Sequence, residues 1–289
     1  MLMRPIMAPP DPPLPLQQSV GFARALTRLG RRAEIEALQD GGQVLVVSRP
    51  LGALGTVRFA SRGPVFHADT PPAARVAALR AAHLHVINAE EDDPTLLRAA
   101  GFRRVMTPAT RAVLPLDPDP DRQLALCHPA WRGNVRQGRQ RGLRIKARPL
   151  CPRRDGWFLA ADREQQRQKR FRALPHAVSL AFADANPGDA LVLTALEGAT
   201  PVAAMLILRH GRAATYQIAW SGPRGRSLRA HPVLLMAAAQ RLAASGVTEL
   251  DLGTIDTDAA PGLARFKLGS GATVRRLGGT WVRLPGWHG

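Results

Sequence analysis

The sequence predicts a protein of the α/β (α+β) class with two domains, each a mixed, mostly antiparallel central sheet flanked by helices. The 289 residues suit two hydrophobic cores, because domains usually contain about 100 to 150 residues. Apolar runs typical of strands alternate with alanine-rich helical segments. The polar stretch DPDPD at residues 117–121 is typical of a linker. We therefore expect domains at residues 20–116 and 117–289, after a disordered, proline-rich leader at residues 1–19.

The first half of the chain predicts short helices and strands that alternate. Gly30 and Gly101 each follow a helical segment, and Pro71 and Pro72 open another, in agreement with the usual places of these residues at helix ends. We expect helices at residues 20–29, 71–82 and 94–100. We expect strands at residues 43–48, 56–60, 83–88 and 111–116, the last of which closes the first domain.

The second half begins with basic helical segments and then becomes more regular. Turns at Gly198 and Gly211 connect three apolar strands as an antiparallel meander. A helix that starts at Pro232 and ends at Gly246 then leads to a parallel strand. We expect helices at residues 131–141, 158–173, 233–244 and 262–267, and strands at 143–147, 190–196, 202–208, 215–220, 248–252 and 274–283.

Composition excludes several classes of protein. With 45% hydrophobic and 21% charged residues, the chain should fold and bury large cores. Two cysteines, Cys127 and Cys151, are too few for a disulfide framework, and His83 and His85 lack a third ligand for a metal site. The chain lacks an apolar run of about 18 residues, which a membrane span needs. The leader also lacks the shorter apolar run of a signal peptide. We therefore expect a cytoplasmic protein with no metal and no transmembrane segment.

The charge distribution indicates an anionic partner. The net charge is +18, and residues 131–172 alone contain 14 basic and three acidic residues. Such a cluster attracts polyanions, so a tRNA or another anionic partner could bind there. Because only Lys146, Lys169 and Lys267 are lysines, the arginine excess could instead reflect coding bias on solvated helix faces.

The order of segments in the second half resembles the GNAT acyltransferase fold. A helix, three antiparallel strands, a helix, a parallel strand, a helix and a strand follow one another, with HPVLLMAAAQRLAASGVTELDLG at residues 231–253 in the middle. The resemblance implies that the strand holding Ile218 and Trp220 diverges from the strand at residues 250–252. Backbone N–H groups would then be open to an acyl carbonyl in the cleft between them.

Short motifs in sequence order resemble the FemAB-like branch, the peptidoglycan aminoacyltransferases and their relatives with two tandem GNAT-type domains. These motifs are RGPV (62–65), LLRAAGF (96–102), TRAVLPL (110–116), WRGNVR (131–136), RGLRI (141–145), LDLG (250–253) and GLARFKLGSGA (262–272). The resemblance implies a degenerate, supporting first domain and a second domain that transfers an acyl or aminoacyl group to an amine acceptor.

Two donors fit this resemblance. The larger Fem enzymes carry a coiled-coil arm for which residues 158–175 leave no room, so we expect acyl-CoA in preference to aminoacyl-tRNA. The chain lacks a clean Arg/Gln-x-x-Gly-x-Gly/Ala loop, the pyrophosphate-binding loop of the GNAT family, although residues 222–226 are glycine-rich and basic. A non-catalytic protein of the same fold that binds RNA or an anionic surface is the alternative.

The segment from Ser221 to His231 is the candidate donor site. It joins a strand to a helix N-terminus, where free backbone N–H groups and the helix dipole favour a phosphate. The residues expected to bind the donor are Ile218, Trp220, Gly222, Arg224, Gly225, Arg226 and Arg229. The alternative interpretation is an arginine-bearing surface turn.

Candidate catalytic residues follow from the same resemblance. Lys267, in the family's Phe-Lys stretch, could stabilise an oxyanion or a donor phosphate, or be a solvated helix lysine. Asp251 or Asp256 could take the amine proton, although Asp251 could equally form a turn or pair with an arginine. The residues expected to bind substrate are Phe266, Tyr216, Trp131 and Asn134, with Tyr216 on the same side of its strand as Ile218 and Trp220. Core packing is the alternative role for Tyr216.

Overall fold

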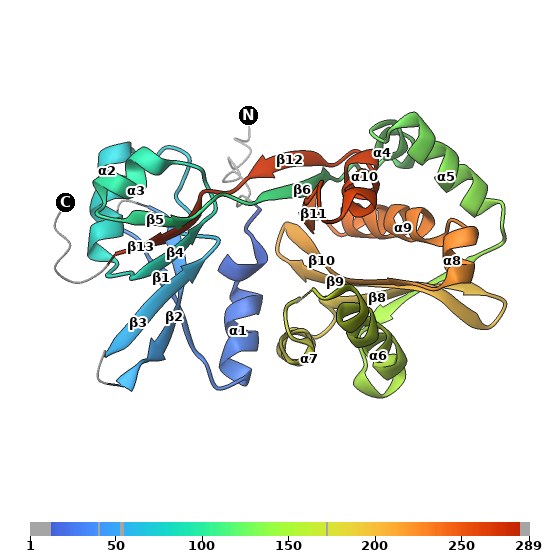
Figure 1. The fold of residues 1–289 in the computed structure, drawn as a ribbon, viewed down its shortest axis with the longest axis horizontal. Coiled ribbons are helices and arrows are strands. Elements are labelled where there is room, and N and C mark those ends of the chain that lie inside the picture. Colours follow the sequence, from blue (N-terminus) through green and yellow to red (C-terminus); the bar gives the residue numbers. More distant parts are fainter. Residues whose placement is uncertain (1–12, 40, 53–54, 172, 284–289) are drawn as a thin grey trace, which may run out of the picture.

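The computed structural model describes residues 13–39, 41–52, 55–171 and 173–283, which form two lobes (Figure 1). Each lobe is built on one mixed sheet with helices on its faces, which confirms the predicted fold class. Residues 1–12 of the predicted leader lie outside the described residues. The end of that leader is part of the N-terminal lobe, since Gln18 is buried and its side chain bonds to Ser61 O at 2.7 Å and to Leu45 N at 2.8 Å.

The N-terminal lobe contains a six-stranded sheet of order β1-β2-β3-β4-β13-β5. Its strands are β1 (Arg32–Ala37), β2 (Gln43–Pro50), β3 (Thr56–Ser61), β4 (Val86–Ala89), β5 (Arg103–Met106) and β13 (Gly279–Val282). Helices α2 (Pro72–Ala81) and α3 (Pro94–Ala99) enclose a core on one face. Helix α1 (Val20–Arg28), preceded by the 3-10 turn η1 (Leu16–Gln18), lies between the two lobes (Figure 1).

The C-terminal lobe contains a seven-stranded sheet of order β12-β6-β11-β10-β9-β8-β7. Its strands are β6 (Thr110–Pro115), β7 (Arg144–Pro149), β8 (Ala190–Glu197), β9 (Thr200–His210), β10 (Ala213–Ser221), β11 (Glu249–Thr254) and β12 (Thr273–Arg276). The predicted meander is confirmed by the antiparallel pairs β8–β9 and β9–β10, and the predicted crossover by the parallel pair β10–β11.

Helices cover both faces of the C-terminal sheet and separate two cores. On one face lie α5 (Pro129–Arg139), α9 (Ala230–Ala244) and α10 (Pro261–Gly269), with the short α4 (Pro120–Ala125) and α8 (Pro223–Ser227) beside them. On the other face lie α6 (Pro152–Lys169) and α7 (His176–Ala185), together with α1. The sheet is therefore buried on both sides, as the unbroken apolar runs of β8 and β9 require.

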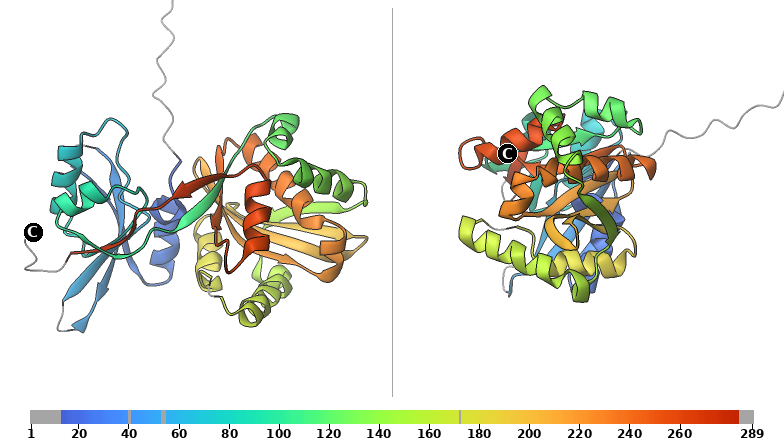
Figure 2. Two further views of the ribbon diagram at one scale, coloured as in Figure 1. Left: turned by 45° about the horizontal axis from the view of Figure 1, so that its top comes forward. Right: turned by 90° about the vertical axis from the view of Figure 1, so that its right-hand side faces the viewer.

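The chain returns to the N-terminal sheet after it has completed the C-terminal sheet. β6, expected to close the first domain, lies in the C-terminal sheet between β12 and β11, and the expected strand 274–283 is two strands, of which β13 lies in the N-terminal sheet. Figure 2 shows β6 and β12 side by side where the chain passes between the lobes. Gly278 permits the change of sheet, because a Cβ there would lie 2.1 Å from Glu91 O. A boundary at residue 117 thus does not separate the two sheets.

Candidate active site

The central strands β10 and β11 diverge within the C-terminal sheet. They pair in parallel through three residue pairs, the last of which joins Thr215 to Asp251. Beyond that pair β10 continues to Ser221 and β11 to Thr254 without being paired to each other. The predicted divergence is confirmed, and we call the gap between these two strand ends the wedge. The facing strand edges carry backbone N–H and C=O groups that a ligand could bind.

Each strand carries a bulge beside the wedge. The register of β10 with β9 shifts between Tyr216 and Ile218, and that of β11 with β6 shifts between Asp251 and Gly253. The bulge at Gln217 reverses the alternation of side chains. Tyr216 therefore packs against the core under α9, whereas Ile218 and Trp220 pack into the core under α6. The expectation that these three side chains share one side was wrong for this reason.

Tyr216 belongs to a set of aromatic side chains on the α9 side of the wedge, here called the aromatic side. Its hydroxyl lies 2.6 Å from Nε2 of His231, whose ring meets that of Phe266 edge-on at 5.5 Å. Trp131 contacts Phe266 at 5.8 Å between ring centroids and donates its indole N–H to Phe266 O at 3.0 Å. Three of the four residues predicted to bind substrate are thus brought together. His231, the fourth member of the set, was not among them.

Burial keeps the aromatic side uncharged. It lowers the pKa of His231 to about 4 and raises that of Tyr216. The imidazole is therefore neutral at pH 7, and the Tyr216 hydroxyl and Nε2 share one hydrogen bond. Nδ1 of His231 is buried and has no hydrogen-bond partner among the described residues. Sequence reasoning placed His231 only at the end of the donor segment, because nothing local pairs it with Tyr216.

On the other side of the wedge Asp251 lies in a buried ion cluster, here called the charged side. Its carboxylate accepts hydrogen bonds from Arg111 Nε and Nη2 at 2.8–3.0 Å, from Arg62 Nη1 and from Gly253 N. Arg62 also binds Glu90 at 2.6 Å and so ties the N-terminal lobe to β11. Burial alone would raise the pKa of Asp251, but the charges and hydrogen bonds of Arg111 and Arg62 lower it to about 2.

These contacts correct the interpretation of Asp251 as the base. A carboxylate with a pKa of about 2, held by two guanidinium groups, takes up a proton poorly at neutral pH. The alternative in which Asp251 pairs with an arginine describes what the structure contains. Asp256 is exposed, and its Oδ1 accepts the N–H groups of Asp258 and Ala259 at 3.0 and 2.7 Å, so it shapes the turn before α10.

Lys267 lies at the end of β11 next to the charged side. Its side chain is buried, and Nζ donates to Thr254 O at 2.7 Å. Burial and the nearby Arg111 lower its pKa to about 8, although Asp251 opposes this shift. Lys267 is therefore not a solvated helix lysine, and its ammonium group faces the end of the wedge strand. Asn134 is half-buried on α5, the helix that also carries Trp131.

The candidate donor segment forms a helix instead of an open loop. After β10 the chain turns into α8, and the N–H groups of Arg226, Leu228 and Arg229 bond to backbone carbonyls at 3.0–3.1 Å. Gly225 is buried against β9, where a Cβ would lie 2.1 Å from Val202 O. The lack of a side chain at Gly225 thus permits α8 to pack closely against β9. These three amides are therefore already bonded within the protein and are not free to bind a pyrophosphate.

The arginines of this segment are exposed and partly occupied. Arg224 pairs with Glu197, with Nε to Oε2 at 2.8 Å, and Arg226 Nη1 bonds to Ser221 O at 2.6 Å. Arg229, at the N-cap of α9, has a φ of +55° and is also exposed. Gly222 donates its N–H to Val202 O at 3.1 Å. These features agree with the alternative of an arginine-bearing surface turn.

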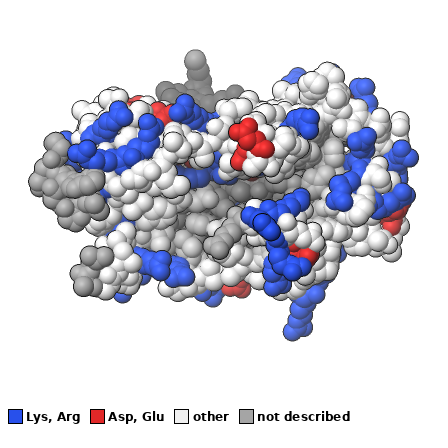
Figure 3. All heavy atoms as spheres, viewed as in Figure 1, with Lys and Arg blue, Asp and Glu red and all other residues white. Residues whose placement is uncertain are grey.

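The basic cluster at residues 131–172 covers α5, β7 and α6. Figure 3 shows lysine and arginine side chains on the C-terminal lobe, both towards α5 and around α6. Within this cluster, Asp155 pairs with Arg148 and Arg154, and Glu164 pairs with Arg167. Many other basic residues of the cluster are exposed. The surface therefore keeps a positive charge that a polyanion could contact.

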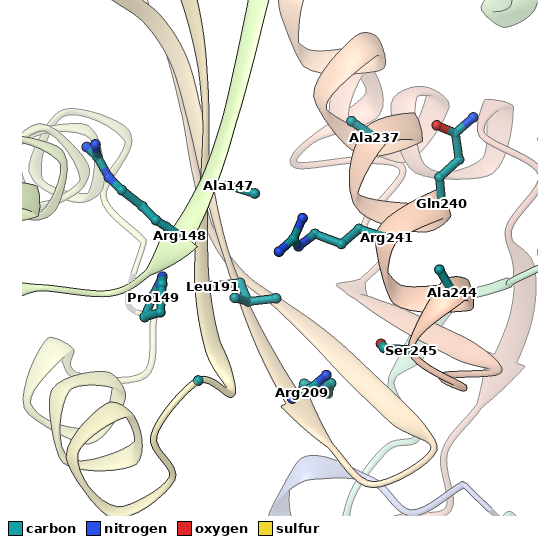
Figure 4. A pocket seen from close by; sticks show the side chains of 11 residues that line it. Ala147, Arg148, Pro149, Leu191, Arg209, Ala237, Gln240, Arg241, Ala244 and Ser245 are labelled. Atoms are coloured by element: carbon teal, nitrogen blue, oxygen red, sulfur yellow. The ribbon is translucent and has the colours of Figure 1, made fainter.

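A cavity of about 750 Å³ lies at the opposite end of α9 from His231, between that helix and strands β7 and β8. Figure 4 shows the guanidinium of Arg241 directed into it, whereas Arg148 points away towards α6. The residues predicted to act on substrate or donor do not line it. This cavity is therefore separate from the wedge.

Other residues singled out from the sequence have structural surroundings. Cys127 is buried with Sγ 3.2 Å from Ser270 O, and burial raises its pKa to about 11, so the thiol stays protonated. Within the described ranges, no three His, Cys, Asp or Glu residues are grouped to hold a metal ion. None of the described helices is both long and apolar enough to cross a membrane.

Residues 131–268, which include the wedge and Lys267, match the family model described as the acetyltransferase (GNAT) domain. This part of the chain is therefore similar to a GNAT domain. No curated protein sequence matches the chain. Among solved structures, that of FemX shares 15% sequence identity with a TM-score of 0.77, and the match covers 94% of this chain and 92% of FemX. The fold is thus that of the FemAB-like tandem GNAT proteins.

Two further structures carry a similar fold. The C-terminal domain of a lysylphosphatidylglycerol synthetase from Agrobacterium fabrum has a TM-score of 0.55 at 15% identity, covering 93% of this chain and 88% of that one. The L-PGS structure from Bacillus licheniformis has a TM-score of 0.55 at 14% identity, covering 90% and 86%. At such identities the likeness to these two structures concerns the fold alone.

Proposed function

We propose that this GNAT protein is an N-acyltransferase that moves an acyl or aminoacyl group to an amine in the wedge between β10 and β11. The observation that carries this proposal is the buried ammonium group of Lys267 at the end of diverging strands. The open strand edges would hold the acyl carbonyl, and Lys267 would stabilise the negative charge that develops on its oxygen.

The transfer needs few groups from the protein. The amine nitrogen attacks the carbonyl carbon of an ester or thioester, a C–N bond forms, and the C–O or C–S bond breaks. The proton lost by the amine passes to the leaving oxygen or sulfur. Because Asp251 is held by two arginines and Asp256 forms a turn, we assign neither as a base. Positioning and the charge of Lys267 would supply the catalysis.

We favour aminoacyl-tRNA over acyl-CoA as the donor. The α8 segment supports this choice, because backbone amides there are bonded internally and Arg224 and Arg226 have partners. The exposed basic cluster at residues 131–172 suits an RNA backbone. Acyl-CoA was expected because this chain leaves no room for a coiled-coil arm. The chain nevertheless matches 92% of FemX without such an arm, so the missing arm no longer argues against aminoacyl-tRNA.

A donor comparison tests the proposal. The purified protein is incubated with total aminoacylated tRNA or with acetyl-CoA, and with a lysine-containing peptide as amine probe, and products are detected by mass spectrometry. We expect transfer from charged tRNA that Lys267→Met reduces and that Arg98→Met, at an exposed basic residue of α3 outside the basic cluster, does not. Transfer from acetyl-CoA alone would contradict the choice of donor. Binding of tRNA without transfer, unchanged by Lys267→Met, would instead support the non-catalytic alternative.

A further inference from the structure

A second cavity, of about 910 Å³, lies in the N-terminal lobe on the face of the sheet turned towards α1. Its walls are mostly apolar and come from α1 and from strands β2, β3 and β4; they include Phe22, Leu26, Val47, Val57, Phe59 and Val86. Leu174, from the connection between α6 and α7, closes one side. A volume of this size lies within the range of cavities that hold small ligands, about 300 to 1,000 Å³.

The apolar floor of this groove is incompletely covered. Helices α2 and α3 bury the opposite face of the same sheet, where Ala60 and Ile87 are fully buried. On the groove face, Val57, Phe59 and Val86 are only half-buried. Alternation along β3 places Val57 and Phe59 on one face and Ala60 on the other. The sheet therefore presents apolar surface that the described part of the chain does not fully shield from water.

Three arginines stand at the edge of the groove. Arg31 and Arg32 lie at the start of β1, and Arg49 lies near the end of β2; all three are exposed and line the cavity. None of them has an ion-pair partner among the residues that the structure describes, and no acidic side chain lines the cavity. In addition, Oε1 of Gln17, another lining residue, is buried without a hydrogen-bond partner. The groove therefore combines an apolar floor with a cationic edge.

We infer that this groove binds a single-chain amphiphile with an anionic head group, its alkyl chain on the β2–β4 floor and its phosphate or carboxylate at Arg31, Arg32 and Arg49. Guanidinium groups bind such oxyanions through paired N–H donors. The apolar surface left between α1 and the sheet would be removed from water by the chain. The inference concerns binding alone and does not depend on the proposed transfer reaction.

Calorimetric titration of the full chain with decyl phosphate, below its micelle concentration, tests the inference. Decyl maltoside, with the same chain and a neutral head, and inorganic phosphate, with no chain, are the matched probes. We expect saturable one-to-one binding of decyl phosphate and at least tenfold weaker binding of both controls. Across octyl, decyl and dodecyl phosphate, affinity should rise by up to about fourfold per methylene group until the groove is filled.

Variants locate the binding. Arg49→Gln should weaken decyl phosphate at least fivefold, whereas Arg98→Gln, an exposed arginine of α3 on the opposite side of the sheet, should not. Val57→Glu should abolish binding, while Val105→Glu on the exposed strand β5 leaves it unchanged. Circular dichroism of each variant verifies folding, and Arg49→Gln provides the test even if Val57→Glu does not fold.

Three results would overturn the inference. The first is equal affinity for decyl phosphate and decyl maltoside, which would show that the head group is not recognised. The second is a decyl phosphate affinity that Arg49→Gln leaves unchanged. The third is binding to phosphatidylglycerol vesicles without any binding of monomeric decyl phosphate, which would assign the arginines to a membrane surface instead of a groove.

Discussion

The two sides of the wedge are both buried, yet they hold opposite kinds of chemistry. On the aromatic side, burial without a countercharge drives His231 to its neutral form, with a pKa of about 4. On the charged side, Asp251 stays ionised with a pKa of about 2, because Arg111 and Arg62 outweigh the same effect. Burial thus decides the protonation of a group only where no charged partner has been placed beside it. The bulges in β10 and β11 assign each side chain to its side.

The largest effect should come from removing the centre of the charged side. Asp251→Ala leaves Arg62 and Arg111 buried without their shared carboxylate, and should lower the free energy of unfolding by about 3 to 5 kcal/mol. Urea denaturation measures this change. The double variant Arg62→Met with Asp251→Leu, which removes charge from both lobes, should recover part of the loss. A decrease below about 1 kcal/mol for Asp251→Ala would contradict a structural role.

Acid should reveal the same interaction. The pKa of Asp251 is lowered from its ordinary 3.8 to about 2, so the unfolded chain binds the proton more readily than the folded chain. The stabilisation is therefore present above about pH 4 and is lost as the pH falls towards 2. Asp251→Asn should weaken this loss in a pH series of urea midpoints. An identical acid dependence in both proteins would argue against the ionised form.

Lys267→Met should reduce transfer by about 10² to 10³-fold, the usual effect of removing one group that stabilises an oxyanion. The control is Arg98→Met, at an exposed basic residue of α3 outside the basic cluster. Because the pKa of Lys267 is about 8, activity that needs its ammonium group should fall as the pH rises above 8. Activity that rises through pH 8 instead would indicate that the neutral amine is the active form.

The stability of the protein at alkaline pH tests whether burial lowers the pKa of Lys267. Its pKa falls from 10.5 to about 8 on folding, so between these values the unfolded chain holds a proton that the folded chain has lost. The contribution of Lys267 to stability should therefore become more favourable as the pH rises from 8 to 10.5. Urea midpoints of the wild type and Lys267→Met should diverge in that window, and parallel curves would contradict the shifted pKa.

A smaller effect is expected on the aromatic side. Tyr216→Phe removes one hydrogen bond and leaves Nε2 of His231 without its partner, which should cost about 1 to 3 kcal/mol of unfolding free energy. Tyr216→Phe combined with His231→Phe removes both polar groups and should cost less than the sum of the single changes. Strict additivity of the two variants would show that the groups do not interact.

The smallest effect should be that of Arg224→Gln in the α8 segment. Its pair with Glu197 is exposed to solvent, so we expect no measurable change in the urea midpoint. If the donor is not held by this segment, the KM for the donor should change by less than twofold. A large rise in KM would indicate that this segment binds a donor phosphate, as expected from the sequence, and would argue against aminoacyl-tRNA as the donor.

Patterns within one segment were sufficient for much of the fold. The apolar runs of β8 to β10, their glycine turns and the helix begun by Pro232 fixed the meander and the crossover, because each depends on neighbours in sequence. The divergence of β10 from β11 followed from a family resemblance and is present. The strand 110–115 was also recognisable, but its sheet was not, since pairing with β11 joins residues far apart in the chain.

The candidate site was predictable only in part, for a similar reason. Phe266, Tyr216 and Trp131 do come together, yet the side of the strand on which Tyr216 lies depends on a bulge that no local pattern marks. Asp251 was misread as a base because its partner Arg62 is 189 positions away in the sequence. Long-range ion pairs of this kind determine pKa values, and they exist only in the folded chain.

The position of β13 in the N-terminal sheet has a consequence for biosynthesis. The N-terminal sheet needs β13, whose residues 279–282 are translated after the whole C-terminal sheet has been made. While the chain is still emerging from the ribosome, β4 and β5 therefore lack the strand that separates them, and their edges stay open to mispairing. The N-terminal lobe therefore cannot complete its sheet until residues 279–282 have emerged, and its open strand edges should need chaperone protection until then.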